Sequence, residues 1–191
     1  GHKGFPGYHF VVLLVGCIPG SIYALRSFWK VKQEHAYQED FRIWMLMLFW
    51  VVLILFSIVQ SKIVHYSSMC YFPLTYLAAL SLEQYISGKE SFPKWKMGMM
   101  WGIGGLFVIA PFLLTYVGFN PAFLQRLLTK DPFAVANLEA EINWTGWEVM
   151  AGVWMLAMLA VFAWYRRLQK IKEAIILSFG GTAIYIFLTL A

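Results

Sequence analysis

A lysine, a histidine and a tyrosine occur close together between two apolar stretches of the chain. The sequence there reads Ser61-Lys62-Ile63-Val64-His65-Tyr66. An ammonium group supplies positive charge, and imidazole and phenol groups supply directional hydrogen bonds. Together Lys62, His65 and Tyr66 are suited to receive the phosphate of a lipid-linked substrate whose tail lies along a helix bundle. Alternatively, Lys62 only extends its ammonium to lipid headgroups. The residues by themselves favour this second interpretation.

The elements around these residues are expected to be membrane helices. Hydrophobic residues make up 60% of the chain and charged residues only 13%, which lies outside the range of soluble proteins. Six apolar runs are long enough to cross about 30 Å of hydrocarbon at about 1.5 Å per residue. They span residues 8–28, 43–59, 66–85, 97–118, 147–165 and 174–191. We therefore predict an all-α integral membrane bundle of about six transmembrane helices, forming one domain over residues 1–191.

The orientation of the bundle follows from its lysines and arginines, which accumulate in cytoplasmic loops. When the loops are assigned alternately to the two sides, eleven of these residues fall on one side: Arg26, Lys30, Lys32, Arg42, Lys89, Lys94, Lys96, Arg166, Arg167, Lys170 and Lys172. The other side has Lys3, Lys62, Arg126 and Lys130, although it includes the longest loop, residues 119–146. Residues 61–66, which include Lys62, and the long loop are therefore expected on the outer side of the membrane. The net charge of +5 needs no nucleic-acid partner.

Three histidines are candidate metal ligands. His2, His9 and His65 are expected on or near the outer side, and three histidines with a carboxylate can bind a metal ion. Their separation in the sequence has no metal-site signature. Cys17 and Cys70 fall in apolar runs, where free thiols behave as small apolar residues. No residue is therefore assigned to a metal or a disulfide.

Two features of the chain resemble a known family. Ser61-Lys62 and His65-Tyr66 are followed by Tyr71-Phe72-Pro73-Leu74, and the chain opens with Gly1-His2-Lys3-Gly4. These segments resemble the late membrane region of the protein-mannosyltransferase-like glycosyltransferases of the GT-C superfamily (family 39-like), which include the bacterial aminoarabinose transferases of lipid A. That family has a serine-lysine pair outside, a histidine-tyrosine or similar pair, a proline-bearing helix, and an earlier Gly-His segment. The resemblance covers Gly1 to about Tyr85.

The resemblance implies transfer of a sugar from a polyprenyl-phosphate donor to a lipid, glycan or protein acceptor, at the outer face of a bacterial inner membrane. Lys62 would neutralise the leaving phosphate, His65 and Tyr66 would orient it, and His2 would line the same cavity. A divalent metal ion is compatible with the family.

The family's catalytic carboxylate has no counterpart in this chain and is expected upstream of Gly1. The chain would then be the carboxy-terminal part of the membrane domain of a longer enzyme. The acidic pair Glu39 and Asp40 is instead expected on the cytoplasmic side, as solvated loop residues.

Two other classes remain open: a lipid or solute transporter, and a structural membrane subunit. A transporter is expected to have buried charges or paired broken helices within its spans. The sequence has few such features, namely Glu83, Pro19, Pro73 and Pro111. Three glycines are interpreted instead as sites of close helix packing: Gly102, Gly104 and Gly105.

Overall fold

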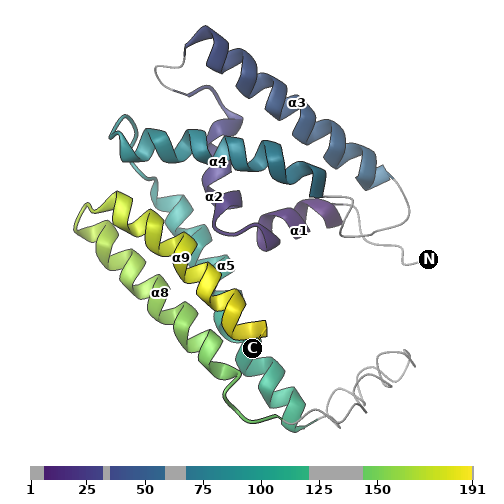
Figure 1. Cartoon of the computed structure of the whole chain (residues 1–191), viewed down its shortest axis with the longest axis vertical. Helices are drawn as coiled ribbons and strands as arrows, with labels where there is room; N and C mark the ends of the chain where they lie inside the picture. Colours follow the sequence, from purple (N-terminus) through teal and green to yellow (C-terminus); the bar gives the residue numbers. More distant parts are fainter. Residues whose placement is uncertain (1–6, 32–34, 59–67, 121–143, 191) are drawn as a thin grey trace.

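The computed structural model describes residues 7–31, 35–58, 68–120 and 144–190, and the regular structure in these segments is entirely helical. Figure 1 shows the arrangement of the helices. They are α1 (Tyr8–Gly16), α2 (Gly20–Ala24), the 3₁₀ helix η1 (Leu25–Phe28), α3 (Ala36–Ile58), α4 (Tyr71–Ile86), α5 (Lys94–Phe119), α8 (Val149–Arg167) and α9 (Ile171–Leu190). The all-α prediction is confirmed for this part of the chain.

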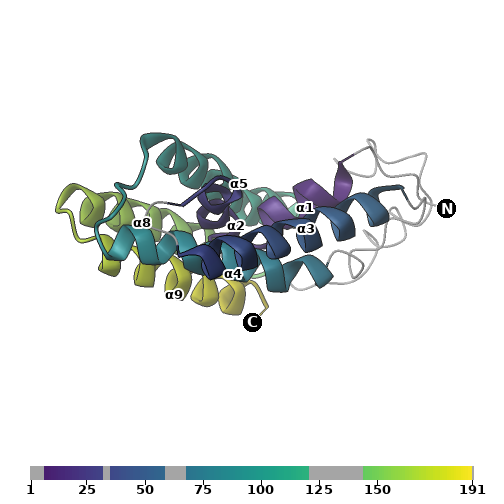
Figure 2. The same cartoon turned by 90° about the horizontal axis from the view of Figure 1, so that it is seen from above.

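The helices form two groups that meet where α2 contacts α5 and where α4 contacts α9. In one group α8 packs against both α5 and α9, and in the other α4 packs against α2, η1 and α3. Contacts of α2 with α5, and of α4 with α9, join the two groups. Figure 2, turned by 90°, shows that the assembly is much broader than it is thick. The molecule therefore presents most of its helical surface outward.

Four helices are long and apolar enough to cross a membrane: α3, α5, α8 and α9. Within their most apolar stretches only 28–33% of the residues are buried in the protein, as expected for helices surrounded by lipid. The first predicted span is instead a pair of helices, α1 and α2–η1, bent by 108°, which gives a fifth span if the pair crosses together. These helices are those of a multi-pass membrane protein.

The predicted number of about six spans is not confirmed by the described residues. The third run, predicted over residues 66–85, corresponds to α4, which has 16 residues. At about 1.5 Å per residue this helix is about 24 Å long, less than the hydrocarbon thickness of about 30 Å. A short 3₁₀ turn over residues 68–70 precedes it.

Helix α3 begins at Ala36, seven residues before the run predicted to start at Ile43. Its first turns are polar, so hydropathy alone places the boundary too late. Glu39 lies in the first turn, where a carboxylate interacts favourably with the helix dipole. Its carboxylate also forms an ion pair with Lys30 Nζ at 3.0 Å. The sequence-based placement of Glu39 and Asp40 in a loop is therefore wrong.

Glycines set the distance between α5 and α8. A Cβ atom on Gly152 would lie 2.6 Å from the carbonyl oxygen of Val108, and one on Gly104 would lie 2.8 Å from the Leu159 side chain. Small residues of this kind let helix backbones approach closely in membranes. The packing role predicted for Gly104 is therefore confirmed. The two other glycines given that role face open space, Gly102 and Gly105.

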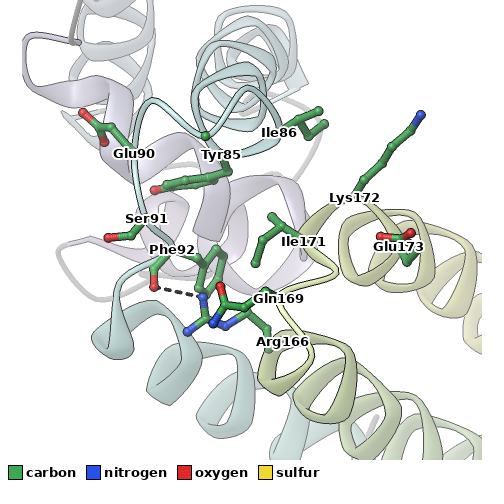
Figure 3. A pocket seen from close by; sticks show the side chains of 11 residues that line it. Tyr85, Ile86, Glu90, Ser91, Phe92, Arg166, Gln169, Ile171, Lys172 and Glu173 are labelled. Carbon is green, nitrogen blue, oxygen red and sulfur yellow. Dashed lines mark hydrogen bonds between the residues drawn. The ribbon is translucent and has the colours of Figure 1, made fainter.

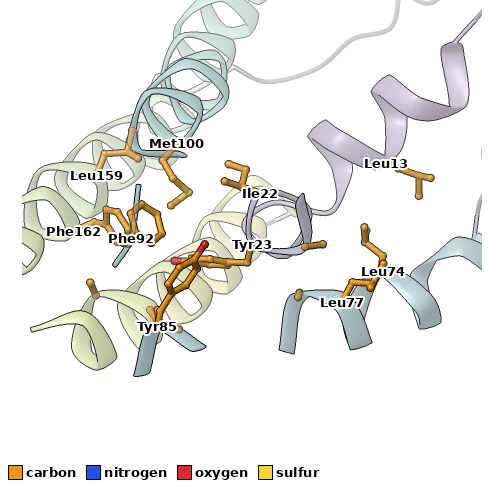
Figure 4. Packing of buried hydrophobic residues seen from close by; sticks show 14 of the residues in the cluster. Leu13, Ile22, Tyr23, Leu74, Leu77, Tyr85, Phe92, Met100, Leu159 and Phe162 are labelled. Carbon is orange, nitrogen blue, oxygen red and sulfur yellow. The ribbon is translucent and has the colours of Figure 1, made fainter. Parts of the chain in front are cut away.

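Aromatic side chains fill the core where the two groups of helices meet (Figure 4). Tyr23 of α2 is fully buried, and its ring centroid lies 6.0 Å from that of Phe92. Phe92 also contacts Tyr85 of α4 and Phe162 of α8, with centroid distances of 5.4 and 6.1 Å. All three contacts are edge-to-face, an arrangement that stabilises aromatic pairs. Phe92 therefore joins α2, α4 and α8.

Every lysine and arginine in the described segments lies near one end of the bundle. We call this the basic end, formed by the ends of η1, α4 and α8 and by the beginnings of α3, α5 and α9 (upper left in Figure 1). The residues are Arg26, Lys30, Arg42, Lys89, Lys94, Lys96, Arg166, Arg167, Lys170 and Lys172. By the preference of these residues for the cytoplasm, the basic end is expected to be cytoplasmic.

Candidate functional site

The residues predicted to bind a donor phosphate, Lys62, His65 and Tyr66, lie outside the described residues, and so does His2. The structure describes the helix ends that precede and follow residues 61–66. Helix α3 ends at Ile58 and α4 begins at Tyr71, both away from the basic end. The site therefore remains a prediction whose flanking helices are known.

An apolar cavity of about 390 Å³ lies along α4, the helix that follows the predicted site. Its lining includes Tyr71, Leu74 and Ala78 of α4, Ile18 from the connection between α1 and α2, and Phe179 of α9. The hydroxyl of Thr75, which also lines it, already donates a hydrogen bond to the carbonyl oxygen of Tyr71 at 2.6 Å. The cavity therefore suits a hydrocarbon chain better than a polar group.

The bend between α1 and α2 borders this cavity. A bend of 108° leaves carbonyl groups at the end of α1 without helical partners. The Ser21 hydroxyl donates a hydrogen bond to one of them, the carbonyl oxygen of Leu14, at 2.7 Å. After the bend, α2 is almost completely buried, with Ile22 and Tyr23 at 0% exposure. The broken helix is thus part of the packed core.

Lys96, near the start of α5, is fully buried at the basic end. Its ammonium donates a hydrogen bond to the carbonyl oxygen of Tyr23 at 2.9 Å. It also lies 5.1 Å from the ring centroid of Tyr85 and 5.5 Å from that of Trp95. Aromatic faces attract cations, so these rings partly replace the water that burial removes. A carbonyl and two rings therefore hold this ammonium.

A largely buried ion pair lies beside Lys96 and joins η1 to the connection between α4 and α5. Arg26 Nε donates to Glu90 Oε2 at 2.6 Å, and Arg26 Nη2 donates to Glu90 Oε1. Another guanidinium nitrogen donates to the carbonyl oxygen of Lys30 at 3.0 Å. The Glu90 side chain is only 9% exposed. Such bidentate pairing fixes the geometry of both side chains.

A second cavity of about 570 Å³ opens at the basic end, between the end of α4, the α4–α5 connection, the end of α8 and the start of α9 (Figure 3). Arg166 lines it and donates a hydrogen bond to the carbonyl oxygen of Phe92 at 3.1 Å. Its guanidinium also lies 4.8 Å from the centroid of the Phe92 ring. The cavity is therefore more polar than the one beside α4.

Two residues that line this second cavity each have a buried donor without an acceptor among the described residues. The donors are the hydroxyl group of Tyr85 and the Nε–H group of Arg166. A buried donor without an acceptor costs about 1–3 kcal/mol relative to a satisfied one. A ligand that supplies acceptors to these donors would remove this cost.

In the sequence, Arg26, Lys96 and Arg166 indicate only the membrane orientation. Their roles depend on partners 64 to 74 residues away along the chain, for which no local pattern exists. The one available signal was at Lys96, which directly precedes the apolar run predicted to begin at Met97. A charge at the edge of a span is a candidate for burial.

The described segments contain no group of three or more histidine, cysteine or acidic residues placed to hold a metal ion. His9 is described, lies in α1 and is fully buried. Cys17 and Cys70 are free thiols, and Cys70 is buried against the carbonyl oxygen of Phe49. No metal ligand set can be assigned within these segments.

Known proteins provide no relative from which a function could be transferred. No family model, no curated protein and no solved structure matches the chain. A functional assignment therefore depends on the residues of the chain and on the geometry described above.

Proposed function

We propose that this chain is part of a membrane glycosyltransferase that uses a polyprenyl-phosphate sugar donor at the outer face of a bacterial inner membrane. The observation that carries the proposal is the apolar cavity along α4, because α4 follows Lys62, His65 and Tyr66 in the chain. A donor phosphate near Lys62 would place its tail beside the start of α4. Tyr71 and Leu74 line the cavity there.

The proposed reaction is a single displacement at the anomeric carbon. The acceptor oxygen forms a bond to that carbon while the bond to the donor phosphate breaks. The acceptor proton passes to a carboxylate outside this chain, and polyprenyl phosphate leaves. The ammonium of Lys62 stabilises the charge that develops on the phosphate, and His65 and Tyr66 orient it. His2 would line the same site. The acceptor is a lipid, a glycan or a protein.

The proposal also includes six membrane spans. Helix α4 alone has 16 residues, but the predicted run from Tyr66 to Tyr85 has the length of a complete span. We propose that α4 and the residues directly before it cross the membrane together. The bent pair of α1 and α2–η1 would then count as the first span, and α4 would complete the six.

The first test is transfer of a radiolabelled sugar from polyprenyl-phosphate donors by membranes that contain the full-length protein. We expect Lys62→Ala to lower transfer by about 100-fold, because it removes the cation that stabilises the leaving phosphate. The matched control is Lys94→Ala, which removes an exposed lysine at the basic end. Equal transfer by the two variants, at matched expression, would contradict the assigned role of Lys62.

The second test fills the apolar cavity. Ala79 lines the cavity and is exposed, so Ala79→Phe is expected to occupy it without disturbing the core. We expect the KM for the donor to rise about tenfold, with a smaller change in kcat. Ala157→Phe is the control, because Ala157 is an exposed alanine of α8 that does not line the cavity. The same KM in both variants would separate the cavity from donor binding.

A transporter is the second candidate, and two observations favour it. The first predicted span is a broken helix, and Lys96 is a buried charge near the start of another span. Both features are typical of transport proteins. The test is movement of a fluorescent phospholipid between leaflets of vesicles that contain the full-length protein. A transporter is expected to lose this movement with Lys96→Met and to keep it with Lys62→Ala.

A further inference from the structure

The cavity at the basic end has features of a binding site that the proposed glycosyltransferase reaction does not use. We propose that it binds the phosphate group of an anionic ligand, supplied either by a phospholipid headgroup or by a soluble phosphate compound. The inference is independent of the proposed function, because none of the residues that line this cavity belongs to the predicted donor site, whose residues precede α4 in the chain.

The walls of the cavity come from three helices and the α4–α5 connection. Figure 3 shows Tyr85, Phe92 and Arg166 along one wall, with Ile171 and Lys172 of α9 across from them. The hydrogen bond from Arg166 to the carbonyl oxygen of Phe92 and the contact of its guanidinium with the Phe92 ring fix the position of this side chain. The guanidinium of Arg166 is therefore held in position before any ligand binds.

The unsatisfied donors indicate what kind of group the cavity accepts. Tyr85 is only 3% exposed, and its hydroxyl has no partner among the described residues. The Nε–H group of Arg166 is buried and also lacks an acceptor there. Both groups need an acceptor, and Arg166 cannot itself accept a hydrogen bond. A phosphate offers several acceptor oxygens and a negative charge.

The charges around the cavity favour an anion once existing pairs are considered. Its lining has two cations, Arg166 and Lys172, and two carboxylates, Glu90 and Glu173. Glu90 is held by two hydrogen bonds from Arg26, which neutralises its charge. Glu173 alone then opposes the two cations. The first turn of α9 also borders the cavity and presents backbone N–H groups that have no helical acceptor.

The place of the cavity is suited to a lipid headgroup. It lies at the ends of α4 and α8 and the start of α9, in the region where all described lysines and arginines are found. Basic pockets between membrane helices on the cytoplasmic side are typical sites for anionic headgroups. A soluble phosphate compound could reach the same donors from the water.

The test measures the thermal stability of the purified full-length protein in a maltoside detergent. The probes are short-chain phosphatidylglycerol, diacylglycerol with the same chains, and inorganic phosphate. We expect phosphatidylglycerol to raise the Tm in a saturable manner, and diacylglycerol to leave it unchanged. A shift with inorganic phosphate as well would support a soluble source, whereas a shift with phosphatidylglycerol alone would support a headgroup. No shift with either phosphate-bearing probe would overturn the proposal.

Three variants locate the site. Tyr85→Phe removes only the unsatisfied hydroxyl, so the protein without ligand should be at least as stable as the wild type. Its affinity for the phosphate-bearing probe should fall about tenfold. Arg166→Gln should weaken binding further. Arg167→Gln is the control, because Arg167 is the exposed neighbour and does not line the cavity. Equal affinities in all three variants would overturn the proposal.

Discussion

The two ends of the bundle use their polar groups differently. At the basic end, hydrogen bonds from Arg26, Lys96 and Arg166 reach partners 64, 73 and 74 residues away. At the opposite end, the described side-chain hydrogen bonds of Thr145, Asn120 and Thr75 reach partners only three or four residues away. Charged side chains therefore connect segments at the basic end. The described hydrogen bonds that connect helices away from that end are neutral: Cys70 Sγ donates to the carbonyl oxygen of Phe49 at 3.8 Å, and Trp154 Nε1–H donates to that of Gly181 at 2.8 Å.

The contrast between the two ends bears on function. Connections between helices keep the basic end in one arrangement, which suits an ordered binding cavity. Away from the basic end, the described hydrogen bonds between helices involve no charged group, and apolar packing sets most of the helix spacing, which suits a groove that accepts a long hydrocarbon chain. Variants that remove contacts at one end should therefore differ in effect from those at the other.

The largest effect is expected from Arg26→Ala. This change leaves the largely buried Glu90 carboxylate without its main partner, and we expect it to lower the free energy of unfolding by about 3 kcal/mol. Unfolding by a denaturing detergent measures the change. Lys89→Ala is the control, since it breaks an exposed ion pair with Glu83 at the same end and should cost less than about 1 kcal/mol.

A double variant sharpens this prediction. Arg26→Met combined with Glu90→Gln removes both charges, so no unpaired carboxylate remains buried. We expect the double variant to be more stable than Arg26→Ala alone, because most of the cost comes from the uncompensated charge. If the Arg26→Ala and Lys89→Ala variants had equal stability, the ion pair would not connect the helices as proposed.

The hydrophobic runs predicted the membrane helices well where the lipid alone determines them. The runs at 97–118, 147–165 and 174–191 correspond to α5, α8 and α9 within three residues at each described end. Hydropathy did not predict the bend between α1 and α2, because both halves are apolar. It also placed the start of α3 too late, since a helix that extends beyond the lipid has polar residues.

The sites were predictable only in part. Gly104 was identified as a packing position, but Gly152 was not, because the close approach depends on the Val108 carbonyl group of another helix. The basic-end cavity depends on segments far apart in the sequence and has no motif. The Lys62, His65 and Tyr66 site came from a motif, and it stays a prediction because these residues lie outside the described segments.

A smaller effect is expected at the turn between α8 and α9. Gln169 adopts a φ of 60°, a left-handed conformation that costs a non-glycine residue roughly 1 kcal/mol or more. The Lys170 N–H group closes the turn on the carbonyl oxygen of Tyr165 at 2.9 Å. We expect Gln169→Gly to raise the free energy of unfolding by about 0.5–1 kcal/mol. Gln169→Ala, which keeps the penalty, should show no such gain in the same unfolding assay.

The smallest effect is expected at the opposite end, where Glu148 precedes α8. The backbone N–H of Thr145 donates to its carboxylate at 3.1 Å, and that of Gly146 donates at 2.8 Å. These hydrogen bonds, that from Thr145 foremost, lower the pKa of Glu148 below its ordinary value. A lowered pKa in the folded state means that the carboxylate contributes stability at neutral pH, and that the contribution is lost as the pH falls through the folded-state pKa.

Comparison of the wild type with Glu148→Gln from pH 7 to about pH 3 tests this expectation. The wild type should have the higher Tm at pH 7, and the difference should shrink as the carboxylate becomes protonated. Because these hydrogen bonds lie within one turn, the difference at pH 7 should be smaller than the loss caused by Arg26→Ala. A difference in Tm that is constant with pH would show that the charge of Glu148 does not matter. A difference as large as that of Arg26→Ala would remove the contrast between the two ends.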